Sequence, residues 1–332
     1  MKNSWIRPLL FFGLAFFIFA ACGRSGRSKT EQGGLENYLH QNGKIKVLST
    51  TAMIGDMVQR VGKGRIDHMT LIVGEVDPHS YELVKGDDEK IDFADIVFYN
   101  GLGLEHGASL QYRLQHHPRA VPLGDLLQKK MGGRFLYVDG QIDPHIWMDV
   151  GFWKETVPLI AEALSDLDPD HKEEFWQNAM ELQNCLTSLD QEIYEMLQAV
   201  PKERRYLVTS HDAFNYFTRR YLADSGEEDW RCRFAAPEGL APDGQLSTSH
   251  LQEIIDHLKC YRVSVLFPES NVNKDSLRKI QKACAEKGLS VRIAAQDLFG
   301  DAMGDVSSGA DNYCSMMKKN AETIVAELSN LP

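Results

Sequence analysis

The chain has 332 residues, of which 43% are apolar and 25% charged, so it is long and apolar enough to bury at least one sizeable core. This composition excludes wholesale disorder. The 36 Lys and Arg residues against 47 Asp and Glu give a formal net charge of −11, which leaves no broad basic surface for phosphates and argues against nucleic-acid binding.

The N-terminus has the pattern of an export signal. Two basic residues precede an apolar run that ends at Ala21 and is short for a membrane span, which predicts a signal peptide over residues 1–21. The small residues directly before Cys22 resemble a bacterial lipobox, in which the cysteine is lipidated and anchors the protein to a membrane. Ordinary signal cleavage, with Cys22 incidental, is the alternative. The polar stretch 22–43 is then expected to be a flexible tether, and the protein to be exported, periplasmic or at the cell surface.

From Lys44 onwards, short apolar runs alternate with amphipathic segments. In the first half, strands are expected over 45–48, 69–73 and 94–99, with a helix over 53–61. The same alternation returns after Arg204, with strands expected over 206–209, 263–267 and 290–293. Strands separated by helices predict parallel β-α-β units, and therefore two α/β lobes over residues 44–168 and 200–332.

Between these lobes the apolar residues recur at alternating spacings of four and three, at Phe175, Ala179, Leu182, Leu186, Leu189, Ile193 and Met196. This spacing predicts one long helix with a single buried seam over about 170–198, roughly 40 Å long. Pro169 and Pro201 mark its ends, so residues 169–199 are expected to link the lobes. A homodimeric coiled coil is the rival interpretation, but packing along both lobes of the same chain accounts for so short a seam, and a monomer is expected.

Three of the eleven histidines lie in distinctive contexts. The tripeptide Asp-Pro-His occurs twice and ends at His79 and at His145, and its proline stiffens each corner of the chain. The preceding Asp can accept a hydrogen bond from the imidazole N–H and so set its tautomer. His211 follows the first strand of the second lobe, at the edge where ligands bind in open α/β sheets, and Asp301 lies in the loop after the last strand.

Two ligands from each lobe would place a cation in the cleft between the lobes. Three neutral imidazoles and one carboxylate suit a borderline transition metal better than Mg²⁺ or Ca²⁺. Because the imidazoles must be neutral, affinity is expected to fall below about pH 6.5. The remaining histidines are expected to be structural or solvent-exposed: His40, His68, His106, His116, His117, His171, His250 and His257. Four further residues are expected either to support the ligands or to make ordinary structural hydrogen bonds: Glu82, Asn100, Asp149 and Glu269.

The six cysteines are scattered without a Cys-x-x-Cys pair, which excludes a zinc knuckle and a disulfide scaffold. If Cys22 is lipidated, five thiols remain. A disulfide between Cys232 and Cys260 is the one pairing expected, and buried, inert thiols are the alternative.

These segments resemble the metal-binding, TroA-like family of solute-binding lipoproteins, which serve ABC importers of zinc, manganese or iron. The resemblance spans about 44–328 and rests on motifs that occur in the family's order: Thr50–Met57, Val76–Glu82, Tyr99–Glu105, Asp143–Asp149, Ser210–Phe217, Phe267–Val272 and Leu298–Asp305. It implies two Rossmann-like α/β lobes joined by a single long backbone helix, with the metal site in the interlobe cleft. It also implies metal ligands at His79, His145, His211 and Asp301, the four residues singled out above.

The resemblance further implies a membrane permease with a separate ATPase as partner, and the chain has no G-x-x-x-x-G-K-[ST] motif of its own. Zinc-specific members often carry a His-rich acidic loop between the first two ligands, whereas residues 105–134 hold only three histidines. The metal therefore stays open among zinc, manganese and iron, although a site of three His and one Asp intrinsically favours zinc.

Two other functions are alternatives. Three histidines can hold a catalytic zinc, but in a zinc-dependent hydrolase one coordination position stays open, and here Asp301 would fill it. A surface adhesin is a label that the family has sometimes received, although the chain has no repeat or stalk. The protein is therefore expected to be a transport receptor and not an enzyme.

Overall fold

The computed structural model describes Leu35, residues 38–242 and residues 246–329. The predicted signal peptide and Cys22 lie outside the described residues. Within the described part of the chain, no helix combines the length and the apolar character needed to cross a membrane. Tyr38, at the end of the predicted tether, is buried and its ring lies 6.1 Å from that of Phe93.

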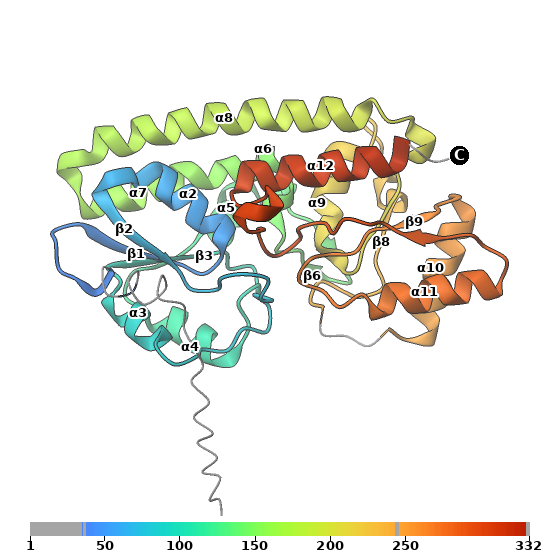
Figure 1. Cartoon of the computed structure of the whole chain (residues 1–332). Coiled ribbons are helices and arrows are strands. Elements are labelled where there is room, and N and C mark those ends of the chain that lie inside the picture. Colours follow the sequence, from blue (N-terminus) through green and yellow to red (C-terminus); the bar gives the residue numbers. More distant parts are fainter. Residues whose placement is uncertain (1–34, 36–37, 243–245, 330–332) are drawn as a thin grey trace, which may run out of the picture.

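The N-terminal lobe is built on a parallel sheet of four strands in the order β2-β1-β3-β4 (Figure 1). The strands are β1 (Ile45–Ser49), β2 (Ile66–Thr70), β3 (Ile96–Tyr99) and β4 (Ala120–Pro122). The helices of this lobe are α2 (Ala52–Gly62), α3 (Asp87–Phe93), α4 (Ala108–His116) and α5 (Leu123–Met131). Alternate residues of a strand face opposite sides, so Val47 joins the core formed with α2, whereas Leu48 joins a second core formed with α3 and α4. Both faces of the sheet are thereby covered.

The strand predicted over 69–73 begins three residues earlier in the structure. It is β2, which spans Ile66–Thr70 and pairs with β1. Helix α2 is followed by a single 3-10 turn, Lys63–Arg65, so the chain enters the sheet at once and buries Ile66. After β2, Leu71 and Ile72 are buried in a loop, in which Leu71 N–H donates to the Ser49 carbonyl at 2.8 Å, whereas Val73 is exposed. The apolar run in the sequence therefore indicated the burial of Leu71 and Ile72, but neither the exposure of Val73 nor the bounds of the strand.

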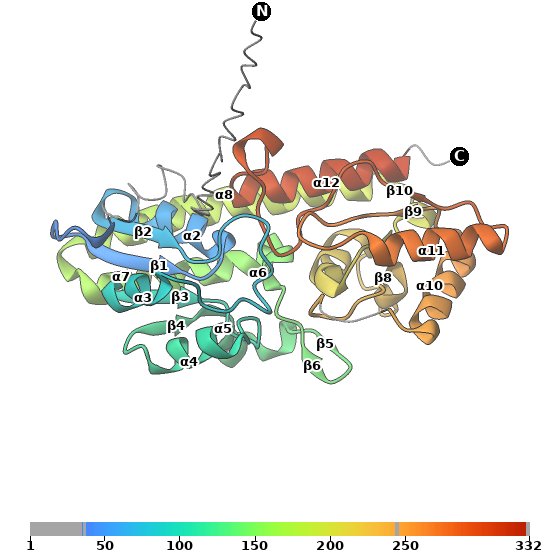
Figure 2. The same cartoon turned by 60° about the horizontal axis from the view of Figure 1, so that its bottom comes forward.

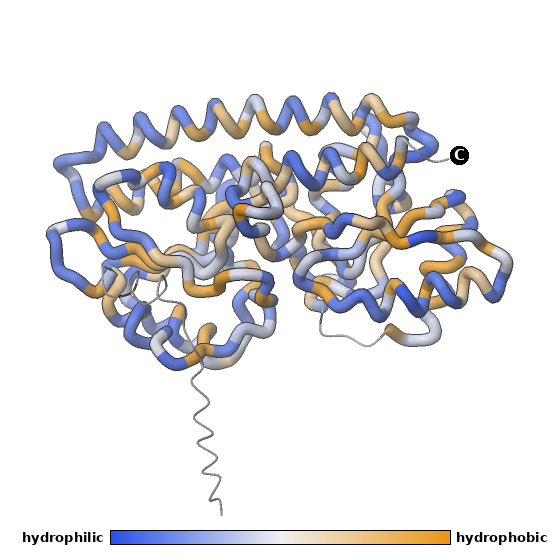
Figure 3. The backbone as a smooth tube through the Cα atoms, in the orientation of Figure 1, coloured by the Kyte–Doolittle hydropathy of each residue, from blue (hydrophilic) through white to orange (hydrophobic). Residues whose placement is uncertain are grey.

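One long helix, α8 (Lys172–Gln198), runs along both lobes (Figures 1 and 2). It has 27 residues and is about 40 Å long. It packs against α2, α7 (Val157–Leu167) and the C-terminal helix α12 (Tyr313–Ser329), and Figure 3 shows its hydrophobic side turned toward these helices. Six of the seven predicted seam residues are buried, and Met196 is half-buried. The seam is thus covered by the same chain.

The C-terminal lobe has shorter strands: β7 (Leu207–Val208), β8 (Phe234–Ala235), β9 (Val265–Leu266) and β10 (Arg292–Ile293). β7 pairs with β8 and β9 pairs with β10, in parallel, and the N–H of Phe267 donates to the Val208 carbonyl between the pairs. The helices of this lobe, besides α12, are α9 (Asn215–Phe217), α10 (Thr248–Cys260) and α11 (Asp275–Glu286). All three predicted strands are present, but each is two or three residues shorter than predicted.

Among the strands, β4, β8 and the antiparallel hairpin of β5 (Tyr137–Val138) and β6 (Gln141–Ile142) were not predicted. The expected disulfide is wrong, since the five cysteines among the described residues are all free thiols. Cys260 is exposed at the end of α10, whereas Cys232 contacts the hydroxyl of Tyr261.

Candidate metal centre

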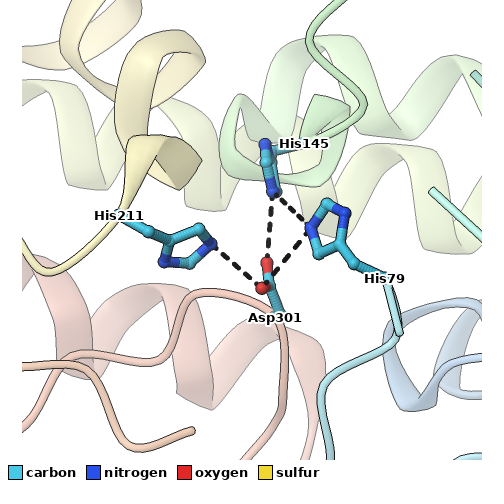
Figure 4. A group of neighbouring side chains, drawn as sticks. All are labelled: His79, His145, His211 and Asp301. Atoms are coloured by element: carbon cyan, nitrogen blue, oxygen red, sulfur yellow. Dashed lines mark hydrogen bonds and ion pairs between the residues drawn. The ribbon is translucent and has the colours of Figure 1, made fainter. Parts of the chain in front are cut away.

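Four side chains from distant parts of the sequence converge between the lobes (Figure 4). Their potential ligand atoms all lie within 4.8 Å of one another, and each residue exposes 3% or less of its surface. They are His79, His145, His211 and Asp301. Two of them belong to the N-terminal lobe and two to the C-terminal lobe, so the structure brings together all four residues that the sequence singled out.

Several of these atoms are spaced as in a tetrahedral metal site. The Nε2 atoms of His79 and His145 are 3.2 Å apart, Asp301 Oδ1 lies 3.3 Å from His145 Nε2, and Asp301 Oδ2 lies 3.0 Å from His211 Nε2. Metal–ligand bonds of 2.0–2.1 Å in a tetrahedral site require edges of about 3.3 Å between ligand atoms. The distance from His79 Nε2 to Asp301 Oδ2 is longer, at 3.7 Å. The two oxygens of Asp301 thus lie near all three imidazoles.

The two Asp-Pro-His tripeptides form the same turn twice. In each, the Asp Oδ1 accepts a hydrogen bond from the backbone N–H of the histidine at 2.9 Å. Asp77 accepts from His79, and Asp143 accepts from His145. Asp143 Oδ1 also lies 2.7 Å from the Nδ1 of His145, so Nδ1 keeps a proton and Nε2 is the atom that binds a metal once its own proton is displaced. The predicted control of the tautomer is confirmed for His145. It is wrong for Asp77, whose other oxygen accepts from the hydroxyl of Ser80 instead.

In the C-terminal lobe, Glu269 supports His211. Its Oε1 accepts the backbone N–H groups of Ser210 and His211 at 2.9 Å, and its Oε2 lies 2.8 Å from His211 Nδ1 as an ion pair. A Cβ at Gly300 would fall 2.4 Å from this Oε2, so the absence of a side chain there leaves room for the carboxylate. Glu269 follows β9 and His211 follows β7, and neighbouring strands of the lobe therefore place them together at the sheet edge.

The other three supporting candidates position loops rather than ligand side chains. Asn100 Nδ2 donates to the Pro144 carbonyl in the second tripeptide. Asp149 accepts from the N–H of Phe152 at the start of α6 (Val150–Trp153). Glu82 accepts from backbone N–H groups at the start of α4.

Two contacts near the site were not predicted. Trp147 Nε1 donates to the Gly300 carbonyl at 2.8 Å, which joins the two lobes beside the ligands. Asn271 Nδ2 lies 3.4 Å from Asp301 Oδ2. Neither contact has a signal in the sequence, because the partners belong to different loops and no local spacing relates them.

The four side chains of the centre differ in the direction in which their pKa values are shifted. Burial lowers the pKa of His79 to about 3, and Asp301 only partly opposes this. Burial also disfavours a charge on His145, but Asp143 and Asp301 outweigh it and raise the pKa of His145 to about 9. For His211 burial is again outweighed, here by Glu269 and Asp301, so its pKa lies well above the ordinary value. Burial of Asp301 is outweighed by His211 and His145, which hold its pKa well below the usual range.

At neutral pH the metal-free centre therefore contains a carboxylate between two protonated imidazoles and one neutral imidazole. A metal ion that enters must displace the two protons, since only a neutral imidazole can be a ligand.

The sequence model of a family described as "Zinc-uptake complex component A periplasmic" matches residues 47–327. The chain belongs to this family. The match covers both lobes and all four convergent side chains. It confirms the resemblance inferred from the motifs.

Individual relatives of the zinc-uptake component A family support the same assignment. The metal-binding protein YtgA of Chlamydia trachomatis is 40% identical over 86% of each chain, and the zinc-binding protein TroA of Treponema pallidum is 32% identical over 87% of this chain and 90% of its own. The manganese-binding lipoprotein MntA of Bacillus subtilis is 29% identical over 99% of this chain and 100% of its own.

Solved structures of this family share the fold. The crystal structure of Fe(III)-bound YtgA from Chlamydia trachomatis covers 85% of this chain and 97% of its own, with 39% identity and a TM-score of 0.80. The periplasmic zinc-binding protein TroA from Treponema pallidum covers 86% of this chain and 99% of its own, with 32% identity and a TM-score of 0.78. The architecture of two α/β lobes joined by one long helix is therefore that of the family.

Replacing Glu269 with glutamine is expected to weaken metal binding by about 10- to 100-fold, the usual cost of losing a partner that orients a ligand. When the amide oxygen accepts the two backbone N–H groups, the amide NH₂ faces His211 Nδ1 and donates to it. The imidazole proton then moves to Nε2, the atom needed for the metal. Competition of the protein with a chromophoric zinc chelator measures the change.

Glu227→Gln is a matched control for this variant, because Glu227 also accepts a backbone N–H in the C-terminal lobe but contacts Arg233 instead of a ligand. Unchanged zinc affinity in the Glu269 variant would contradict the role assigned to this carboxylate.

Proposed function

We propose that this protein is an exported receptor that captures one transition-metal ion between its lobes and delivers it to the permease of an ABC importer. The observation that carries the proposal is the buried, convergent set of three imidazole nitrogens and one carboxylate, drawn from both lobes. Membership of the zinc-uptake component A family supports the transport role. The ATPase of such an importer is a separate chain.

The cargo is zinc, manganese or iron. The relatives support this range, since TroA is named for zinc, MntA for manganese, and YtgA was solved with Fe(III). Within the range, three imidazoles and one carboxylate bind Zn²⁺ more tightly than Mn²⁺ or Fe²⁺, so occupancy in the cell also depends on which ion is available.

Capture and release need only reversible coordination. His79 and His145 come from the lobe assigned to residues 44–168, and His211 and Asp301 from the lobe assigned to residues 200–332. A displacement of one lobe would therefore remove half of the ligands at once. The linker at 169–199 contains α8, and a continuous helix along both lobes favours small lobe movements over a wide hinge. Release then follows when the permease shifts the ligands of one lobe.

The site geometry favours this function over hydrolysis. A catalytic zinc keeps one coordination position for water or substrate, whereas here a buried carboxylate supplies the fourth ligand. We therefore assign no enzymatic activity. The seam of α8 is covered within the chain, which supports a monomeric receptor.

For the N-terminus we propose a cleaved signal over residues 1–21 and lipidation of Cys22, with residues 22–43 as the tether to a bacterial membrane. MntA, which this chain matches over nearly its whole length, is named a lipoprotein. The receptor would then face the periplasm or the cell surface. Expression of the full chain with Cys22→Ser in a bacterial host tests the anchor, because the variant should leave the membrane fraction while the wild type stays there.

Elemental analysis of residues 22–332, purified without chelator, tests the function. One equivalent of zinc, manganese or iron per chain is expected. His250→Ala, which changes an exposed histidine on α10, is the control and should retain this equivalent. Protein that holds no metal even after incubation with all three ions would overturn the proposal.

A further inference from the structure

The metal centre is closed to solvent, since its four side chains expose 3% or less of their surface. A hydrated dication would have to lose its water before it met the first ligand, and an unpaired charge in a buried place is costly. One exposed imidazole lies next to the buried ones. The ring of His106 is centred 5.8 Å from that of His79, at an angle of 55°.

His106 is held in the tautomer that can bind a metal. Its Nδ1 lies 3.2 Å from the Gly103 carbonyl oxygen, and since a carbonyl only accepts hydrogen bonds, Nδ1 carries the proton. Its Nε2 therefore keeps a free lone pair. Metal-binding histidines generally use one ring nitrogen in this way and the other as a ligand.

The loop that carries His106 is held by hydrogen bonds to a buried carboxylate. The buried carboxylate of Glu105 accepts from the Thr50 hydroxyl at 2.7 Å and from the backbone N–H groups of Asn100 and Gly101 at 2.8 and 3.0 Å. Residues 101–103 all have positive φ, between 57° and 82°. Positive φ is unfavourable for Leu102, because it is not a glycine, and the surrounding hydrogen bonds keep it in this conformation. The neighbouring carboxylate thus holds His106 in place.

The same loop packs directly against the loop of the first Asp-Pro-His tripeptide. A Cβ at Gly107 would fall 2.0 Å from the Tyr81 carbonyl oxygen, two residues beyond His79. Glu82 adds hydrogen bonds to the N–H groups of Ala108 and Ser109. These contacts fix the distance between the two imidazoles, so the proximity of His106 to His79 is a property of the fold.

We propose that His106 is an entry ligand, which binds the hydrated ion at the protein surface and transfers it to His79. This inference rests on the proposed function. The exposed imidazole replaces one water before the ion enters, which divides the dehydration into smaller steps and supplies the entry path that a buried site requires. His106 is not among the four residues of the closed site, so it lowers the barrier to entry and exit without holding the bound ion.

Stopped-flow binding of Co²⁺ to residues 22–332 tests the proposal. Trp147 supplies the signal, because its ring lies 5.3 Å from that of His145 and a paramagnetic ion in the site quenches its fluorescence. In His106→Ala, the association and dissociation rate constants are both expected to fall about tenfold, with an unchanged Kd. His106→Asn should behave like the alanine variant, whereas His106→Cys, assayed under reducing conditions, should restore the rates because a thiolate can bind the ion.

His116→Ala is the matched control. His116 is also exposed, and its Nδ1 lies 2.7 Å from the Tyr112 carbonyl, but its ring contacts Tyr112 rather than a metal ligand. This variant should bind at the wild-type rate. Wild-type rates in His106→Ala, a weaker Kd with unchanged association, or slow binding that cysteine does not restore would each overturn the entry role. A wild-type protein that fails to bind Co²⁺ at all would overturn the proposed function as well.

Discussion

Replacing Asp301 with alanine is expected to abolish retention of the metal. Loss of a residue that only orients a ligand lowers metal affinity by up to about 100-fold, and loss of the ligand Asp301 should lower it by more than that. Asp301 is the only anion among the four convergent ligands, and its two oxygens face the Nε2 atoms of His145 and His211 at 3.3 and 3.0 Å. Without it, a dication in this buried site would have only neutral imidazoles as ligands. Chelator competition and metal content per chain measure the loss.

Two companion variants make this result specific. Asp301→Asn keeps the size of the side chain but not its charge, so it should also lose the metal while the protein stays folded. Asp305→Ala removes a nearby carboxylate that only caps a short turn, and it should keep its metal. Full retention in Asp301→Ala would contradict the assignment, and retention combined with altered hydrolytic turnover would favour the zinc hydrolase.

Metal affinity is expected to rise steeply as the pH is raised towards about 9. The metal-free protein binds protons at His145, with a pKa of about 9, and at His211, with a pKa well above its ordinary value, and the metal displaces both. Raising the pH removes the competing protons, so the metal-bound state becomes more stable relative to the metal-free state. Each displaced proton contributes about a tenfold change in affinity per pH unit, hence roughly 100-fold for the two. His79, with a pKa of about 3, contributes nothing in this range.

Calorimetry at pH 7.5, in buffers with different ionisation enthalpies, counts the protons released on binding. Two per metal ion are expected, and binding without proton release would contradict the charge state inferred for the empty centre. The metal-free protein should show the opposite trend in stability. The raised pKa of His145 stabilises the fold below the unfolded-state value of about 6.5, and this contribution is lost as the pH rises through about 9.

The pH range shows where sequence and structure differ. From ordinary histidine chemistry, affinity was expected to fall only below about pH 6.5. The repeated tripeptide made His145 visible in the sequence, together with Asp143, which accepts from its ring. Glu269, which together with Asp301 raises the pKa of His211, follows β9 and is 58 residues away in sequence, and only the contact of β7 with β9 places its carboxylate there.

The fold was predictable where the pattern was long. The seam of α8 repeats over 27 residues, so helical periodicity identified it almost to the residue. The two-residue strands of the C-terminal lobe are too short to define their own ends, since the surrounding apolar residues are buried in loops. For β2, the apolar run included the buried residues Leu71 and Ile72, but pairing with β1 decided which residues form the strand. His106 was expected to be an ordinary exposed residue because its neighbour His79 is 27 positions away.

The long helix α8 also affects how empty and loaded receptors compete for the permease. Because α8 is continuous along both lobes and packs against α2, α7 and α12, we expect loaded and empty receptors to have nearly the same outline. A permease that contacts both lobes then binds empty receptors almost as readily as loaded ones. Import therefore depends on the fraction of receptors that carry an ion rather than on their total number, and surplus receptor in a metal-poor cell slows uptake.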